Sequence, residues 1–150
     1  MNQPDQRPRS QRLAVLYLQL AEATAGRGPA STHHRLLLLA GRHAADAEWK
    51  AEAEACRELV LASNPHHAIG HYACFADALQ SDDYLTLDRQ LERQCPQEKA
   101  EHLAEIQHVD TDLVVREPPR LVVHDILARL KGEDRAGDAV PEPQPGKSPG

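Results

Sequence analysis

The chain has 150 residues, of which 41% are apolar and only 3% aromatic, and it carries a formal charge of −6 at pH 7. This length suits one domain with a substantial core, and an interior of Leu, Ala and Val with few aromatic rings favours helices over sheets. The 17 Lys and Arg are scattered among 23 Asp and Glu. That pattern excludes the basic stripe typical of nucleic-acid-binding proteins, so we expect no nucleic-acid partner.

The two ends of the chain differ in composition from the segment between them. Residues 1–9 hold two prolines and no apolar pattern, and we expect a flexible tail there. Arginines precede the apolar segment 13–20 as in a signal peptide, but its spacing is helical and Gln19 interrupts it. No apolar run approaches the roughly 20 residues of a membrane span, so we expect no membrane partner. Residues 132–150 are rich in Pro and charged residues, which predicts a disordered tail.

Between these tails, over residues 10–131, apolar residues recur at helical spacing in one segment after another. Four consecutive leucines, Leu36–Leu39, mark a second helix that should be buried on most sides. In the third helix, Glu52 and Glu54 are expected on the solvent side. Short links make successive helices antiparallel neighbours. We expect about seven helices in a single all-α domain, with apolar stripes over 13–21, 36–45, 49–60, 69–79, 84–91, 100–106 and 123–130.

Cysteine usage bears on the compartment. The three cysteines, Cys56, Cys74 and Cys95, lie in or at the ends of expected helices. An odd number of cysteines without close pairing does not form a disulfide framework. We therefore expect free thiols in a reducing environment, which indicates a cytoplasmic location.

An internal repeat crosses the middle of the chain. The segment 31–36 (Ser-Thr-His-His-Arg-Leu) is similar to the segment 64–69 (Asn-Pro-His-His-Ala-Ile). Within the unit that this repeat defines, Gly41, Ala53 and Pro65 succeed one another at equal intervals. A period of about 34 residues, made of two helices and ending in proline, resembles the tetratricopeptide repeat. In that family a small residue stands where the two helices cross.

The resemblance covers about residues 31–96 and implies both a fold and a function. The fold would be a short right-handed stack of antiparallel helical hairpins, whose concave groove holds a peptide or partner helix as a non-catalytic adaptor. In the second unit Cys74 and Tyr84 replace the family's glycine and alanine, so an ordinary six- or seven-helix bundle is the alternative fold. The groove residues implied by the resemblance are His34, Arg35, Leu38, Arg42, His67, His71 and Gln80.

Two alternative functions arise from the residues themselves. His67 and His71 are four apart, which places them on one face of a helix. With a third ligand from His34 or His102 they would form a metal-binding helical bundle, because zinc needs three or four protein ligands. The other alternative is a small dimeric regulator that buries Leu36–Leu39 between copies. The sequence contains no phosphate loop, nucleophile elbow or Cys-x-x-Cys pair, so we expect neither enzymatic activity nor a cofactor.

Overall fold

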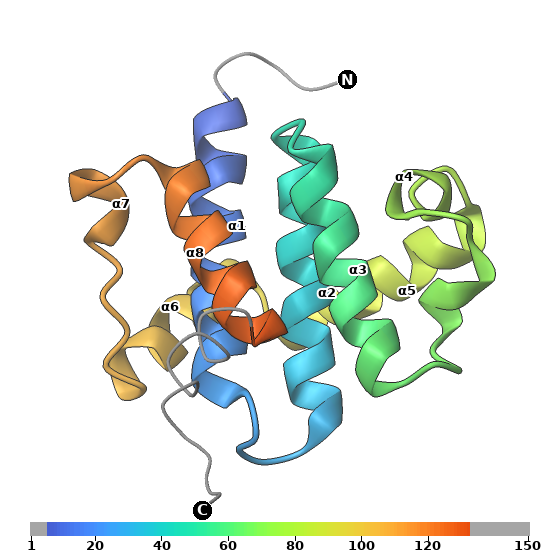
Figure 1. Cartoon of the computed structure of the whole chain (residues 1–150), viewed down its shortest axis with the longest axis horizontal. Coiled ribbons are helices and arrows are strands. Elements are labelled where there is room, and N and C mark those ends of the chain that lie inside the picture. Colours follow the sequence, from blue (N-terminus) through green and yellow to red (C-terminus); the bar gives the residue numbers. More distant parts are fainter. Residues whose placement is uncertain (1–5, 133–150) are drawn as a thin grey trace, which may run out of the picture.

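The computed structural model describes residues 6–132, whose regular elements are all helices (Figure 1). The predicted all-α class is thereby confirmed for this part of the chain. The tail expected over 132–150 lies outside the described residues apart from Gly132, as do residues 1–5. No helix among the described residues is long and apolar enough to span a bilayer. The elements are α1 (Arg7–Thr24), α2 (Ala30–Asp46), α3 (Lys50–Ser63), the 3-10 helix η2 (Ala68–His71), α4 (Phe75–Ala78), α5 (Asp82–Gln94), α6 (Gln97–Ile106), α7 (Leu113–Arg116) and α8 (Pro119–Lys131).

Helix α1 begins at Arg7, inside the stretch expected to be a tail. Pro8 is compatible with this start, because the N–H that proline lacks has no partner in the first turn of a helix anyway. From Leu13 to Ala21 every residue of α1 is buried, since α2, α6 and α8 all pack against this helix. The first helix therefore begins closer to the N-terminus than the sequence indicated.

Helices α1, α2 and α3 form the centre of the molecule, and α2 lies between the other two (Figure 1). The turn between α1 and α2 uses Gly26 and Gly28, both at positive φ (73° and 72°), a conformation that glycine adopts without strain. Helix α5 also packs against α2, so each residue of Leu36–Leu39 is at most 2% exposed. The predicted burial of this run is confirmed. Because these leucines are covered within one chain, they do not form an exposed surface of the kind that the dimeric alternative uses.

Helix α8 returns to the start of the chain and packs against both α1 and α3 (Figure 1). Arg129 Nε lies 2.5 Å from Glu22 Oε2 on α1, and Arg120 Nε lies 2.8 Å from Glu52 Oε2 on α3. In a linear repeat stack each unit contacts only its neighbours, so the contact between α8 and α1 departs from the expected open stack. The same helix covers Glu52, which is only 3% exposed and not on the solvent side as expected.

The single helix expected over 69–79 does not form. Its residues make η2 and the one-turn helix α4, joined by extended backbone at Tyr72 and Cys74 (ψ 148° and 171°). Side chains of α3 bind the backbone groups that this break leaves free. Arg57 Nη2 donates to the Tyr72 carbonyl at 2.6 Å, and Glu54 Oε1 accepts from the Phe75 N–H at 2.9 Å. These bonds stabilise the break in a segment whose Gly70 and His71 already have low helix propensity.

Gly41 lies in α2 where this helix meets α3 and the start of α4. A Cβ atom at this position would be 2.5 Å from Phe75 Cε2 and 3.2 Å from Cys56 Cβ. The close approach that the spacing of Gly41 indicated is therefore present. The ring that fills the space, however, belongs to Phe75, which lies outside the hairpin from which the approach was inferred.

A buried hydroxyl joins α1 to the end of α5. Tyr17 is 1% exposed, and its Oη donates to the Cys95 carbonyl at 2.7 Å. We expect Tyr17→Phe to lower the free energy of unfolding by about 1–2 kcal/mol, because the buried carbonyl then lacks its donor. Urea unfolding followed by circular dichroism measures this. Tyr72→Phe is the matched control, since among residues 6–132 its half-buried hydroxyl bonds to the Ser81 hydroxyl alone, at 3.1 Å. Equal losses in the two variants would contradict the prediction.

Candidate functional site

A hollow of about 450 Å³ opens where α2 begins, α3 ends and α5 ends. We name it the α2 notch. Leu38 and Leu91 supply its apolar part, and hydroxyl, amide, imidazole and guanidinium groups surround them. The notch is thus a mixed surface that suits a ligand with both apolar and polar groups. Its lining consists of Ala30, Ser31, His34, Arg35, Leu38, Ser63, Asn64, His67, Leu91 and Gln94.

The structure brings together four of the seven groove residues implied by the repeat. The offset between the two His-His pairs does place His34 beside His67, with ring centroids 6.3 Å apart. Sequence reasoning missed the contributions of Ser31, Ser63, Asn64, Leu91 and Gln94, and nothing in the sequence shows that the end of α5 meets the start of α2. The four predicted residues that line the notch are His34, Arg35, Leu38 and His67.

The other three predicted groove residues lie elsewhere. Arg42 lies about one turn beyond Leu38 on α2 and faces acidic groups. Its Nη1 is 2.8 Å from Asp88 Oδ2, and its Nε is 3.3 Å from Asp46 Oδ2. His71 and Gln80 are exposed and do not line the notch. The reason is the break in the expected helix over 69–79, which removes the regular face that would have aligned these side chains with His67.

The notch contains a half-buried arginine without an acidic partner. Among residues 6–132, three arginines are half-buried. Two of them form ion pairs, Arg42 with Asp88 at 2.8 Å and Arg57 with Glu54 at 2.6 Å. The third, Arg35, pairs with no carboxylate of the described chain, and its buried Nε has no hydrogen-bond partner there. Because a guanidinium carries five N–H donors, Arg35 has donors available for a group outside this chain.

Three imidazoles lie close together beside Arg35. The rings of His33 and His34 are 6.1 Å apart, and His67 is the third member. His67 Nδ1 accepts from the Ile69 N–H at 3.0 Å, so the proton of the neutral ring lies on Nε2. His34 is 8% exposed, and its buried Nε2 has no partner among the described residues. Burial is the main cause that lowers the pKa of all three histidines below the ordinary value.

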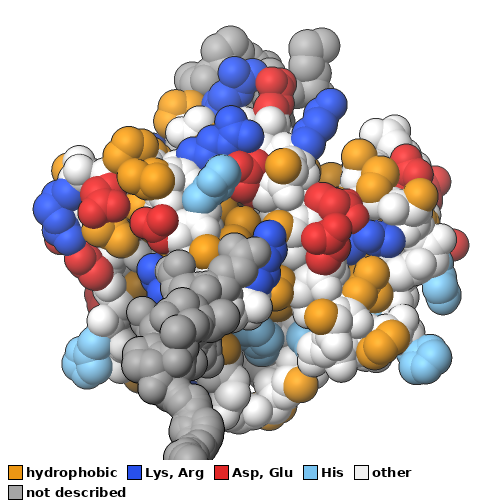
Figure 2. Space-filling view, in the orientation of Figure 1, with side chains coloured by type: hydrophobic (Ala, Val, Ile, Leu, Met, Phe, Trp, Pro, Cys, Tyr) orange, Lys and Arg blue, Asp and Glu red, His pale blue; other side chains and the backbone are white. Residues whose placement is uncertain are grey.

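The charge of the notch is opposite to that of the chain. Its lining contains one arginine, two histidines and no carboxylate, although the chain carries a formal charge of −6. On the face seen in Figure 2 acidic and basic side chains are intermixed, without a large patch of either sign. Four other hollows of the described surface each contain at least one carboxylate, from Glu101, Glu52, Asp46 and Glu98 respectively.

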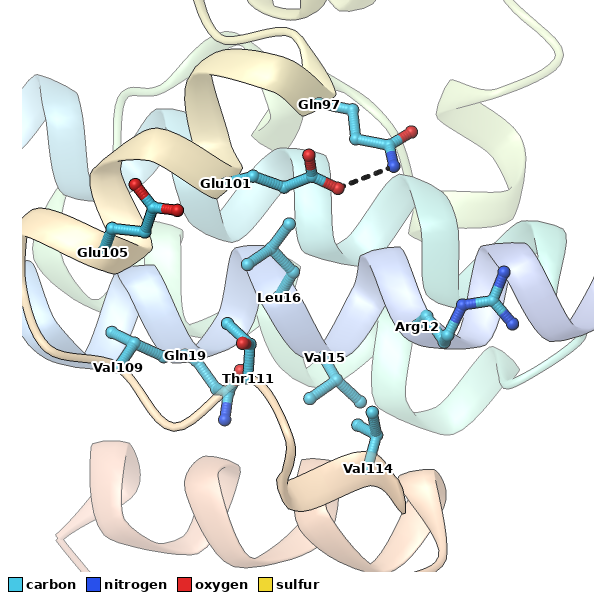
Figure 3. Close-up of a pocket in the computed structure, with 10 residues that line it drawn as sticks. All are labelled: Arg12, Val15, Leu16, Gln19, Gln97, Glu101, Glu105, Val109, Thr111 and Val114. Atoms are coloured by element: carbon cyan, nitrogen blue, oxygen red, sulfur yellow. Dashed lines mark hydrogen bonds between the residues drawn. The ribbon is translucent and has the colours of Figure 1, made fainter.

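One of these hollows, of about 380 Å³, lies between α1, α6 and the segment before α7 (Figure 3). Figure 3 shows Leu16 of α1 between Glu101 of α6 and Val15. Polar side chains in its wall already have partners within the chain. Gln97 Nε2 donates to Glu101 Oε2 at 3.0 Å, and Gln19 Nε2 donates to the Asp110 carbonyl at 3.0 Å. The α2 notch is therefore the better candidate site, because buried polar atoms in its wall have no partner within residues 6–132.

The metal-binding alternative finds no support in the arrangement of ligands. Within residues 6–132, no group of three or more His, Cys, Asp or Glu side chains is placed to hold a metal ion. His67 precedes η2 and His71 ends it, so the two do not share the face of an α-helix as expected. His67 Nδ1 is also engaged with Ile69. Of the two proposed third ligands, His34 does lie beside His67, whereas His102 is exposed on α6.

The chain matches no protein-family model, no curated protein sequence and no solved structure. Membership of the tetratricopeptide family therefore stays a prediction, and the function is argued from the chemistry of the α2 notch.

Proposed function

We propose that this chain is a non-catalytic interaction module that binds a short segment of a partner protein in the α2 notch. The observation that supports it is Arg35, the one half-buried arginine within residues 6–132 that has no carboxylate beside it. Arginines that combine an apolar setting with free donors are common among the residues that contribute most to protein interfaces. At about 450 Å³, the notch suits a few side chains of a peptide better than a whole helix.

The chemistry of the notch favours binding over catalysis. A catalytic histidine needs a nucleophile or substrate on one nitrogen and an orienting group on the other. Within the described chain, the one hydrogen bond that orients His67 comes from the Ile69 N–H, and no carboxylate orients His34 or His67. Free thiols at Cys56, Cys74 and Cys95 suit a reducing compartment, and we place the module in the cytoplasm as part of this proposal.

Panning displayed random peptides against the full-length chain tests this function. We expect enriched peptides whose addition shifts the backbone amide signals of residues 30–38, 63–67 and 91–94. Gln94 lines the notch, so the larger indole of Gln94→Trp should occupy the space that the peptide needs and abolish binding. Gln90→Trp, also exposed on α5, is the matched control and should bind normally. Failure to enrich any peptide, or signal changes confined to α6 and α7, would overturn the proposal.

A further inference from the structure

We propose that the group recognised in the α2 notch is the carboxylate of a Glu or Asp side chain in an extended peptide, flanked by an apolar residue. This inference rests on the proposed function and specifies the partner for the same site. It follows from three properties of the lining: an unpaired guanidinium, a pair of imidazoles and an apolar base, with no competing acid.

The guanidinium of Arg35 is the main anchor. A carboxylate accepts two parallel hydrogen bonds from arginine, and such bonds are stronger than those between neutral groups. The chain itself pairs each of its other half-buried arginines with a carboxylate, Arg42 with Asp88 and Arg57 with Glu54. Arg35 stands in an equivalent setting, but the acid that would complete the pair is not among residues 6–132. An acidic side chain of a partner supplies it.

The imidazoles add donors and define the polarity of the site. Because His67 Nδ1 accepts from Ile69, the neutral ring presents Nε2–H as a donor, which suits a carboxylate oxygen and not a cation. His34 Nε2 is enclosed and has no partner among the described residues, so charging this ring in the empty notch is unfavourable. An anion in the notch lowers that penalty for both rings.

The rest of the lining favours a peptide over a free small acid. Leu38 and Leu91 offer an apolar base for the residue next to the acid. Asn64 Oδ1 already accepts from the His66 N–H at 3.2 Å, which leaves the Asn64 amide N–H groups to donate. With Ser63 and Gln94, these groups suit the carbonyls and N–H groups of an extended backbone.

Binding should be coupled to protons. The titratable side chains in ring contact with His34 are His33 on α2 and His67 after α3, and Arg35 is the next residue on α2. Near Arg35 lies Cys95 after α5, where burial raises the pKa of the thiol, so that this thiol stays neutral. No carboxylate lines the notch. A bound carboxylate raises the lowered pKa values of His34 and His67, so the complex takes up protons and its affinity rises as pH falls from 8 to 6. The peptide acid, with a pKa near 4, stays ionised throughout.

Titration of the full chain with short capped peptides tests this inference. The probe is Gly-Ser-Leu-Glu-Leu-Ser-Gly, acetylated and amidated, and its counterpart carries Gln in place of Glu. Amide signals of residues 30–38, 63–67 and 91–94 report binding at the notch. We expect the glutamyl peptide to bind about tenfold more tightly than the glutaminyl peptide, and about three- to tenfold more tightly at pH 6 than at pH 8.

Three further measurements show which side chains cause the preference for the glutamyl peptide and its pH dependence, and whether a free carboxylate binds. Arg35→Gln should remove the preference for the glutamyl peptide, whereas Arg93→Gln, an exposed arginine of α5 outside the notch, should keep it. His67→Asn keeps an acceptor for the Ile69 N–H and should flatten the pH dependence. Sodium acetate at the peptide concentration should not shift the signals. Circular dichroism checks that each variant folds.

The outcomes separate this inference from the proposed function. Equal binding of the glutamyl and glutaminyl peptides at the notch would overturn carboxylate recognition and leave the interaction module standing. Acetate binding as tight as that of the peptide would overturn recognition of a peptide. If the selected peptides bind in the notch but are not enriched in Glu or Asp, this result would also overturn carboxylate recognition.

Discussion

The Gly41→Leu variant is expected to lose about 3 kcal/mol or more of its free energy of unfolding, with a melting temperature lower by roughly 6–12 °C. The first added atom, Cβ, would lie 2.5 Å from Phe75 Cε2 and 3.1 Å from Phe75 Cζ. The ring has no room to retreat, because Phe75 is 1% exposed and meets Tyr84 edge-on at 5.9 Å. Relief therefore requires α2 to separate from α3 and α4.

A second pair of variants identifies Phe75 as the obstacle. Gly41→Ala adds one methyl group, and the better helix propensity of Ala, worth about 1 kcal/mol, offsets part of the clash. Combining Gly41→Ala with Phe75→Leu should cost less than the sum of the two single changes, because the smaller side chain accepts the new methyl. Thermal melts by circular dichroism measure all of these. Ala62→Leu, at an exposed position of α3, is the control. An unchanged melting temperature for Gly41→Leu would show that the close contact is absent.

The environment of Gly41 also shows what the sequence reveals and what it hides. Spacing of small residues indicated a tight approach at Gly41, and the structure has one. The sequence does not show that Phe75 is the residue in contact with Gly41. This contact depends on the break in the helix that was expected between His67 and Phe75. The groups responsible are Glu54 and Arg57 on α3, which hold backbone atoms of Phe75 and Tyr72. A periodicity argument treats such charged side chains as solvent-facing and does not see these long-range bonds.

The candidate site was predictable to the extent that local repetition determined it. The His-His pair before Arg35 recurs before Ala68, and this repetition does bring His34 and His67 together in the notch. Leu91 and Gln94 belong to α5. The contact of α5 with α2 depends on the path of the chain that connects these two helices. Sequence periodicity describes the face of each helix but not which distant helix covers it. The unpaired state of Arg35 is likewise a property of three-dimensional packing alone.

Glu52 was expected to face solvent and is instead buried. Its substitution is the second change for which we expect a large loss in the free energy of unfolding. Helix α8 covers it and supplies its partners. Arg120 Nε and Nη2 donate to the two carboxylate oxygens at 2.8 and 3.2 Å, and His124 Nε2 contacts the same group. Arg120 also lies over the Trp49 ring, with Cζ 6.0 Å from its centroid. The cluster therefore joins α8 to the start of α3.

The Glu52→Gln variant should be less stable than the wild type by about 2–3 kcal/mol at pH 7. Breaking a buried ion pair typically costs about 3–5 kcal/mol, and the half-exposed side chain of Arg120 (54%) reduces that figure because water replaces part of the lost partner. Urea unfolding at pH 7 measures the loss. Glu58→Gln, an exposed acid of the same helix, should change stability by less than about 0.5 kcal/mol.

The pH dependence of that difference identifies the charge of Glu52 as the cause. Burial alone would raise the pKa of Glu52, but the hydrogen bonds from Arg120 and His124 outweigh it and lower the pKa to about 2. A carboxylate whose pKa is lower in the folded than in the unfolded chain stabilises the fold above pH 4.5, and this contribution is lost as pH falls toward 2. The wild type should therefore lose stability more steeply than Glu52→Gln between pH 5 and pH 3, and the gap between them should narrow. Parallel curves over this range would mean that the ionised carboxylate does not hold α8 against α3, and that the loss at pH 7 comes from packing alone.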